Sequence, residues 1–186
     1  MKDRVEDLLN TDFDSERNTL TSYTSCIERR LSNMEGCFKA EKTRKNIALK
    51  EDLIVYKVYM QDVPLKVGEL LHCITVIHPG DVDSEFYMTK GHYHIDGNCD
   101  EIYYGQKGQG LLLLQKGNEK KYLEMYSDTI AYIPAGWGHR TVNISRKEPF
   151  VFFSVWPAQS GHDYERSIKE PFQMRVFKSG RSYIIV

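Results

Sequence analysis

The stretch from Gly91 to Gly105 reads GHYHIDGNCDEIYYG and decides the interpretation of this chain. Because side chains alternate faces along an extended strand, His92 and His94 project to the same side, with Tyr93 between them. Two imidazoles on one face of a strand have the geometry of a chelate. Glu101 follows His94 at an odd offset, which would place it on the opposite face if the strand simply continued.

A turn between the two histidines and Glu101 is predicted at residues 96–98, Asp-Gly-Asn. Gly and Asn tolerate positive φ, and an Asp side chain bonds its own backbone. A chain reversal here places Glu101 on the next strand, EIYYG, where its carboxylate returns to the cavity of the two imidazoles. His139 is a further candidate, because the turn-rich segment PAGWG (134–138) sets it at the head of another strand, RTVNI.

These four side chains predict one metal site, built from His92, His94, Glu101 and His139. A single histidine is most often a surface residue or a hydrogen-bonded core residue, which is how we interpret His72 and His78. The combination of three imidazoles, a carboxylate and a Pro-Gly frame favours a ligand set. Such a shell suits a borderline divalent transition ion, and iron(II), manganese(II), zinc and nickel are all compatible.

The chain from residue 51 onward is predicted to be an all-β barrel. Short runs rich in β-branched and aromatic residues recur there at close intervals, separated by turn clusters such as HPGDVDS, DGNCD and KGNEK. Many short strands at such spacing indicate a sandwich or a closed barrel rather than βαβ units. Two runs, GLLLLQ and FVFFSVW, are almost continuously apolar, as expected for strands covered on both faces, one cover being a candidate partner subunit. The runs are LIVYKVYM, LLHCITVI, EFYMT, EIYYG, GLLLLQ, KYLEMY, TIAYI, RTVNI, FVFFSVW, FQMRVF and RSYIIV.

The first fifty residues are more highly charged and are predicted to be an extension, 1–50, whose helical segments pack outside the barrel domain, 51–186. Leu20, Tyr23, Ile27, Leu31 and Met34 recur at three- and four-residue steps, the period of an amphipathic helix. EKTRKNIALK (41–50) is predicted to be a second, short helix. Residues 1–19 are expected to be partly disordered. The length of 186 residues fits a single domain.

Composition excludes several classes of function. The chain has 25 basic and 26 acidic residues, so it has no global attraction for nucleic acid or for an anionic membrane. The four cysteines are scattered without a CxxC pair, which favours reduced thiols over a zinc ribbon or a disulfide framework. The N-terminus MKDRVEDLLN has no apolar leader, and no stretch is long enough to span a membrane. We therefore expect a cytoplasmic protein.

Two motifs in the chain resemble those of the cupins. The first cupin motif reads His-x-His, a gap, Glu, six residues and Gly, and six residues separate Glu101 from Gly108. The second, Pro-x-Gly-x-x-His-x-x-x-Asn, is met by residues 134–143, although Asp128 stands where that motif usually opens with Gly. The gap after His94 is longer than usual and is similar to that of cupin-type phosphoglucose isomerases. The wider signature of that family is carried by RRLSNMEG (29–36), MTKGHYH (88–94), HRTVN (139–143) and PAQSGHDY (157–164).

This resemblance implies a fold, an activity and a cofactor. The fold would be the cupin double-stranded β-helix, a jelly-roll barrel. The activity would be the metal-dependent interconversion of glucose 6-phosphate and fructose 6-phosphate, in glycolysis or gluconeogenesis. One divalent ion per subunit is implied, Fe2+ or Mn2+ before Zn2+ or Ni2+, and the small cupins of this family pair as homodimers. Two alternatives remain open: an iron-dependent cupin dioxygenase, and a non-catalytic sugar-binding cupin.

A sugar phosphate needs a site for a dianion, and Thr89, Lys90 and Gly91 precede the first histidine. A hydroxyl, an ammonium and a glycine backbone N–H are donors of the kind that a phosphate requires. Alternation places Thr89 and Gly91 on one face, so Lys90 is a secondary candidate. The family resemblance adds Thr75 and His162 at the phosphate end of the substrate.

Glu101 and Tyr103 are the candidates for catalysis. Tyr103 lies two residues after Glu101 and shares its face, and a β-core tyrosine is about as plausible from the residues alone, whereas the resemblance favours a substrate contact. Glu101 is open to two interpretations. Either it coordinates loosely and shuttles the proton through a cis-enediolate, or it is purely a ligand and hydrogen moves as hydride between C2 and C1.

Overall fold

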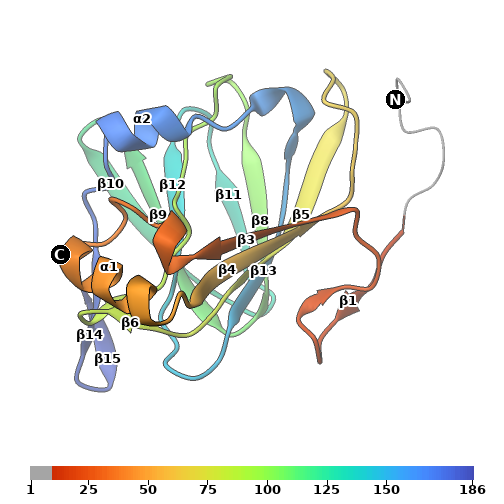
Figure 1. The fold of residues 1–186 in the computed structure, drawn as a ribbon. Helices are drawn as coiled ribbons and strands as arrows, with labels where there is room; N and C mark the ends of the chain where they lie inside the picture. The colour runs from red at the N-terminus through yellow and green to blue at the C-terminus, as the bar shows by residue number, and fades with distance from the viewer. Residues whose placement is uncertain (1–9) are drawn as a thin grey trace.

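The computed structural model describes residues 10–186, which form an antiparallel β-barrel with few helices (Figure 1). The strands are β1 (Phe13–Asp14), β2 (Thr19–Leu20), β3 (Ser25–Arg30), β4 (Ile54–Met60), β5 (Leu70–Ile77), β6 (Asp81–Val82), β7 (Glu85–Phe86), β8 (Glu101–Lys107), β9 (Gln109–Lys116), β10 (Glu119–Tyr126), β11 (Ile130–Ile133), β12 (Gly138–Asn143), β13 (Phe150–Pro157), β14 (Val176–Ser179) and β15 (Ser182–Ile185). The helices are α1 (Glu41–Lys50) and α2 (Tyr164–Lys169), with 3-10 segments at Leu31–Asn33 and Ala158–Ser160.

Two sheets make the walls of the barrel. The larger has six strands in the order β11-β8-β13-β5-β4-β3, and the smaller has three in the order β10-β9-β12. The main core cluster takes apolar side chains from both, among them Leu111 to Leu114 of β9 and Phe150 and Phe152 of β13. All six central residues of β9 are buried, which matches its continuous apolar run. The prediction of an all-β jelly-roll barrel is confirmed.

The strand β13 explains why the barrel has an interior suited to a site. It pairs antiparallel with β5 on one side and with β8 on the other. Its buried positions alternate toward its C-terminal end, where Ser154 and Trp156 are buried and Val155 is half-buried. One face of the strand therefore lines the interior, and the other face points away from it.

The predicted helix through Leu20, Tyr23, Ile27, Leu31 and Met34 is wrong. Residues 25–30 form strand β3, which pairs with β4 at the edge of the six-stranded sheet. The apolar residues share no face: Leu31 and Met34 are fully buried in the main core, whereas Tyr23 is 47% exposed. Pairing with β4 gives these residues backbone hydrogen bonds and a packed neighbour in the sheet. A helix here would have no shared apolar face to bury, so the strand is favoured.

The second helix prediction is confirmed, since α1 spans the residues of EKTRKNIALK. Residues 13–14 and 19–20 form the β1–β2 hairpin, and residues 1–9 lie outside the described residues, so the expectation of partial disorder in residues 1–19 stays a prediction. The division of the chain at residue 50 stays a prediction, and β3 pairs with β4 across it. Among residues 10–186, no helix is both long and apolar enough to cross a membrane.

Candidate metal centre

The two histidines of the first motif lie beside the strand that carries the third. His92 and His139 form an isolated antiparallel bridge, in which the His92 N–H donates to the His139 carbonyl at 3.1 Å and the His139 N–H donates to the His92 carbonyl at 2.9 Å. This backbone pairing holds segment 92–94 against β12, although it is too short to count as a regular strand. The prediction that His139 stands near the head of a strand is confirmed, since β12 begins at Gly138.

The turn that brings Glu101 back is also confirmed. The Asp96 carboxylate accepts a hydrogen bond from the backbone N–H of Asn98 at 3.0 Å, which is the local pattern expected of an Asx turn. The Cys99 N–H donates to the Asp96 carbonyl at 3.2 Å and tightens the reversal. Strand β8 begins at Glu101, so the carboxylate faces the barrel interior at the first residue of the strand.

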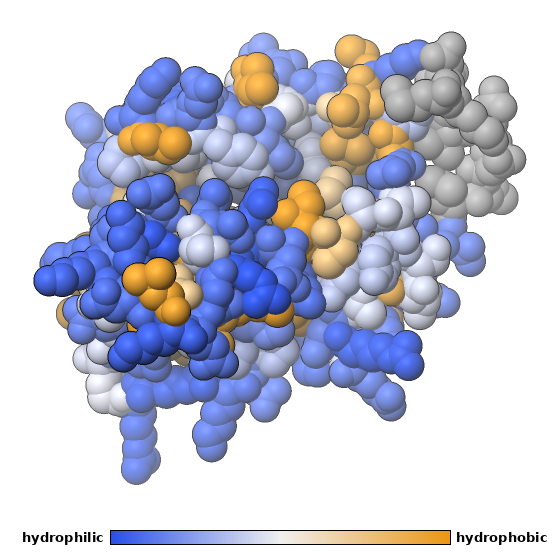
Figure 2. Space-filling model, viewed as in Figure 1, coloured by the Kyte–Doolittle hydropathy of each residue, from blue (hydrophilic) through white to orange (hydrophobic). Residues whose placement is uncertain are grey.

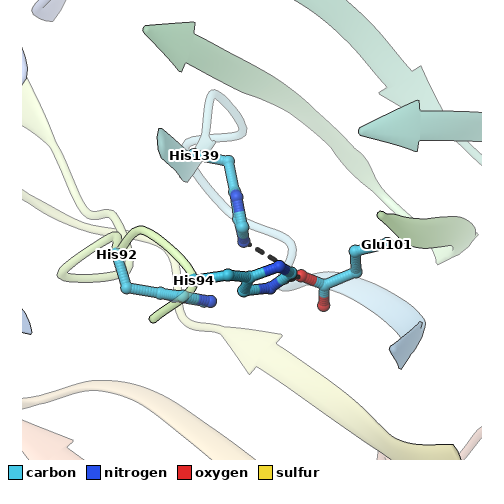
Figure 3. Close-up of side chains that lie close together, drawn as sticks. All are labelled: His92, His94, Glu101 and His139. Carbon is cyan, nitrogen blue, oxygen red and sulfur yellow. Dashed lines mark hydrogen bonds and ion pairs between the residues drawn. The ribbon is translucent and has the colours of Figure 1, made fainter. Parts of the chain in front are cut away.

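The four candidate ligands converge on one point (Figure 3). One ligand atom from each of the four side chains lies within 4.8 Å of the others. The Glu101 Oε2 atom lies 3.2 Å from the His94 Nε2 atom and 3.0 Å from the His139 Nε2 atom. The four residues come from three separate segments, 92–94, β8 and β12, so the fold itself assembles the cluster.

Backbone carbonyls fix the orientation of two of the imidazoles. The Nδ1 atom of His94 lies 3.0 Å from the Cys99 carbonyl oxygen, and that of His139 lies 3.2 Å from the Trp137 carbonyl oxygen. A carbonyl only accepts, so each Nδ1 carries the proton and each Nε2 presents a lone pair to the centre. Hydrogen bonds of this kind from the second ring nitrogen are typical of histidines that bind metals.

The His92 Nε2 atom is buried and has no hydrogen-bond partner within the described residues. A buried nitrogen without a partner costs free energy unless something else occupies its lone pair. A divalent cation between His92 and the other three side chains would satisfy it. The donor set of three imidazoles and a carboxylate therefore fits a transition-metal ion.

The pKa shifts at the centre also favour metal binding. Burial alone would raise the pKa of Glu101, but His139 and His94 outweigh it and lower that pKa, so the buried carboxylate is held ionised. Burial lowers the pKa of His92 well below its usual range, and the neighbouring imidazoles His139, His162 and His94 add to this effect. A negative carboxylate beside a neutral imidazole is the protonation state that metal binding requires.

A cavity of about 370 Å³ opens next to the centre. Seven of the residues proposed from sequence line it, namely Thr75, Thr89, Gly91, His92, Glu101, Tyr103 and His162. Among the described residues, Lys90 is not part of the lining, and its backbone carbonyl instead accepts from the Arg140 guanidinium at 2.7 Å. The alternation argument, which made Lys90 the secondary choice, agrees with this placement.

Thr89 and Gly91 pack directly against β12. The Thr89 hydroxyl oxygen accepts from the Thr141 N–H at 3.0 Å, which leaves its own proton available to a ligand in the cavity. Gly91 has a φ of +73°, and a Cβ there would lie 2.6 Å from the Phe172 ring and 2.9 Å from the His139 carbonyl oxygen. Close packing therefore accounts for this glycine, whatever its backbone binds.

Tyr103 and His162 each contact the ring of one candidate ligand. The Tyr103 ring stacks on Phe152 with ring centroids 4.7 Å apart and meets the His139 ring edge-on at 5.9 Å. Burial raises the pKa of Tyr103 well above its usual range, so it remains a hydrogen-bond donor. The ring centroid of His162 lies 4.1 Å from that of His92, and burial lowers the pKa of His162 to about 4.

Sequence reasoning missed several residues of the cavity wall. The lining also includes Arg29, Tyr56, Ser154, Trp156 and Tyr164. Ser154 and Trp156 lie inside the run FVFFSVW, where alternation along β13 is the only signal that could have found them. Tyr164 stands two residues after His162 and begins α2, a helix that was not predicted.

The jelly-roll barrel and the three-histidine, one-glutamate centre together define a cupin with a candidate metal site. A family model described as Glucose-6-phosphate isomerase (GPI) matches residues 28–182. The chain belongs to this glucose-6-phosphate isomerase family.

Two curated relatives show how closely the chain follows that family. The glucose-6-phosphate isomerase of Pyrococcus furiosus is 41% identical over 85% of this chain and 84% of its own length. The glucose-6-phosphate isomerase of Thermococcus kodakarensis is 43% identical over 86% of this chain and 82% of its own length. A solved oxalate decarboxylase is more distant, at 21% identity and a TM-score of 0.46 over 57% of this chain and 27% of that chain.

Proposed function

We propose that the protein is an aldose-ketose isomerase that interconverts glucose 6-phosphate and fructose 6-phosphate with the help of a divalent metal ion. The observation that carries the proposal is the cavity, whose wall combines His92 and Glu101 of the candidate ligand cluster with the hydroxyl groups of Thr75, Thr89 and Tyr103. The assignment is further supported by membership of the isomerase family. Its metabolic setting would be glycolysis or gluconeogenesis in the cytoplasm.

The reaction moves hydrogen between C1 and C2 and needs a proton acceptor, a partner for the developing negative oxygen and a grip on the phosphate. A divalent ion held by His92, His94, Glu101 and His139, Fe2+ or Mn2+ in our proposal, would polarise the carbonyl. Glu101 supplies a carboxylate at the reacting carbons. Tyr103 donates a hydrogen bond beside it, since its hydroxyl stays protonated.

The rest of the cavity orients the substrate. Thr89 offers a hydroxyl proton, and Thr75 lies on β5 in the same wall. Contacts to the phosphate are remote from the reacting carbons, so their binding energy serves to align the substrate over the centre. The polar groups in the lining, among them Thr75, Thr89 and His162, favour a sugar phosphate over the apolar substrates of a dioxygenase. His162 lines the same cavity, with its ring centroid 4.1 Å from that of His92, which supports a contact with the substrate.

The direct test is a coupled assay on the purified, Mn2+-loaded protein. We expect turnover of glucose 6-phosphate to fructose 6-phosphate, and turnover of unphosphorylated glucose lower by about a hundredfold or more, because charge-assisted phosphate contacts contribute several kcal/mol. Oxygen uptake is the matched measurement for the dioxygenase alternative. Binding of the sugar phosphate without any turnover would instead identify a non-catalytic sugar-binding protein.

We further infer that two copies of the chain pair through the outer face of β11, β8 and β13. Ile102 pairs in register with Tyr132 on β11 and with Val155 on β13. On this face Ile130 is 72% exposed and Tyr132 is 55% exposed. Exposed apolar side chains in adjacent register form a patch of the kind that subunit interfaces cover.

Light scattering after size exclusion measures this pairing. We expect the mass of two chains for the wild type and of one chain for Tyr132→Glu, because the substitution buries a charge in the interface. Tyr122→Glu is the matched control, since Tyr122 is 49% exposed on β10 in the other sheet. A single-chain mass for the wild type would refute the homodimer.

A further inference from the structure

Arg29 is the one arginine or lysine in the wall of the cavity among the residues that the structure describes. It lies on β3, the strand at the edge of the six-stranded sheet, well separated in sequence from every residue assigned to the site so far. Glu101 is the only acidic side chain in the same wall, again within residues 10–186. The cavity therefore contains one fixed cation and one carboxylate.

Alternation along β3 directs Arg29 into the cavity, since Ile27, two residues earlier, lines the cavity as well. The register between β3 and β4 pairs Arg29 with Tyr56 and then shifts, so that Arg30 pairs with Ile54. The bulge therefore lies after Arg29 and changes the direction of the chain at Arg30. The Arg30 side chain has partners outside the cavity wall. Its guanidinium lies 2.6 Å from the Glu28 carboxylate and donates to the Asp52 carbonyl at 2.7 Å.

The Arg29 guanidinium has no carboxylate at ion-pair distance in the described part of the chain, residues 10–186. A half-buried arginine usually has a carboxylate partner, and its neighbour Arg30 has one. A guanidinium that no carboxylate of residues 10–186 neutralises attracts an anion to the cavity it lines, because the low-dielectric walls screen its charge less than water does.

Tyr56 links Arg29 to the segment that carries Thr89 and Gly91. It faces Arg29 across the β3–β4 pair, and its hydroxyl forms a hydrogen bond with the Lys90 backbone. Burial raises the pKa of Tyr56 to about 12, and the charge of Arg29 opposes that rise. Burial likewise raises the pKa of Tyr164, and Arg29 is the largest opposing influence. Arg29 is therefore close to the wall formed by Tyr56, Tyr164 and residues 89–91.

We propose that Arg29 binds the phosphate of the substrate and is the specificity-determining cation of the cavity, a position that the sequence assigned secondarily to Lys90. This inference rests on the proposed isomerase function for the identity of the ligand. A guanidinium offers parallel N–H donors to two phosphate oxygens and remains charged at any physiological pH. Thr89, across the cavity lining, would donate to a third oxygen.

The test compares Arg29→Met with Lys90→Met, a matched control that removes a neighbouring charge outside the cavity wall. Binding of a non-isomerisable hexitol 6-phosphate is measured by calorimetry, and steady-state kinetics are measured with glucose 6-phosphate. For Arg29→Met we expect affinity to fall and KM to rise by about ten- to hundredfold, because a charge-assisted contact is lost. We expect kcat to change by less than about threefold, since Arg29 acts away from the reacting carbons.

Two further variants separate charge from packing. Arg29→Lys is expected to recover part of the affinity, because a point charge replaces the fork without its paired geometry. Thr89→Ala is expected to raise KM in the same direction as Arg29→Met but by less, since it removes a neutral donor. Thermal melting of each variant checks that the barrel is intact.

The outcomes distinguish this inference from the isomerase proposal. Wild-type affinity for the hexitol phosphate in Arg29→Met, or equal losses in Arg29→Met and Lys90→Met, would overturn the role of Arg29 while leaving the isomerase in place. A wild type that binds the hexitol phosphate without isomerising glucose 6-phosphate would remove the proposed reaction and leave the anion site standing. Failure of Arg29→Lys to recover any affinity while Arg29→Met melts early would show that Arg29 only supports the fold.

Discussion

Chelation is expected to reduce isomerisation by about a thousandfold or more, because a cation that polarises a carbonyl contributes several kcal/mol to the transition state. The physical basis is the cluster of His92, His94, Glu101 and His139, whose ligand atoms lie within 4.8 Å of one another. Without a cation, only the neighbouring imidazole side chains are left to stabilise the buried carboxylate. Dialysis against a chelator, metal analysis of the product and the coupled assay measure the effect.

Restoration separates a catalytic ion from one that only supports the fold. Added Mn2+ or Fe2+ is expected to return activity, and the one that returns more identifies the better-suited ion. His92→Gln is expected to lower both metal content and turnover. His72→Gln is the matched control, because His72 lies near the Gln61 side chain, with Nε2 and Oε1 3.1 Å apart, and is not a member of the cluster. Full activity in a sample shown to be free of metal would contradict the role of the ion.

Much of the barrel and the centre could be predicted because both leave local signals in the sequence. The Asp-Gly-Asn turn at 96–98 and the strand that begins at Glu101 follow from residues within a few positions of each other. His139 was found through the turn-rich segment that precedes it. In each case the physical cause, a turn or an alternation of faces, acts within a single element.

The N-terminal strand could not be predicted, because its stability comes from a distant partner. Residues 25–30 pair with β4, and the periodicity of Leu20 to Met34 gave the wrong element. The three- and four-residue spacing arose by chance in a strand and a 3-10 turn whose buried residues enter different clusters, Leu20 in one and Leu31 in another. Tertiary pairing outweighed local period here.

Arg29 was missed for the same reason. Alternation along β3 turns Arg29 toward the cavity together with Ile27, and this face could not be assigned while the segment was predicted to be a helix. Arg29 is the first residue of the family segment RRLSNMEG, but that segment does not indicate the direction of its side chain. Lys90, by contrast, was predicted because it stands two residues before the first histidine. Among the described residues, it is not part of the cavity wall.

Glu101→Gln is expected to lower kcat by about a thousandfold or more while changing the affinity for a hexitol 6-phosphate by less than about threefold. Glutamine keeps the shape of the side chain but removes the negative charge and the proton acceptor. The carboxylate of Glu101 is buried and is held ionised by His139 and His94, so the substitution removes a charge that the site is built around. Kinetics at saturating Mn2+, calorimetry and metal analysis together measure the outcome.

The same variant separates the two interpretations of Glu101. If the residue serves only to hold the ion, raising Mn2+ until the variant is fully loaded should restore most of the turnover. If Glu101 carries the proton between C2 and C1, turnover stays low at full loading, and the wild type exchanges deuterium from C2 of the substrate into solvent.

Glu85→Gln is the matched control. Glu85 is 1% exposed, its carboxylate lies 2.7 Å from the Arg175 guanidinium, and it is not part of the cavity wall among the described residues. It should lower the melting temperature and leave kcat near the wild-type value, because a broken buried ion pair costs stability without touching the substrate. Equal losses of turnover and of hexitol phosphate affinity in Glu101→Gln would show instead that the whole site had collapsed.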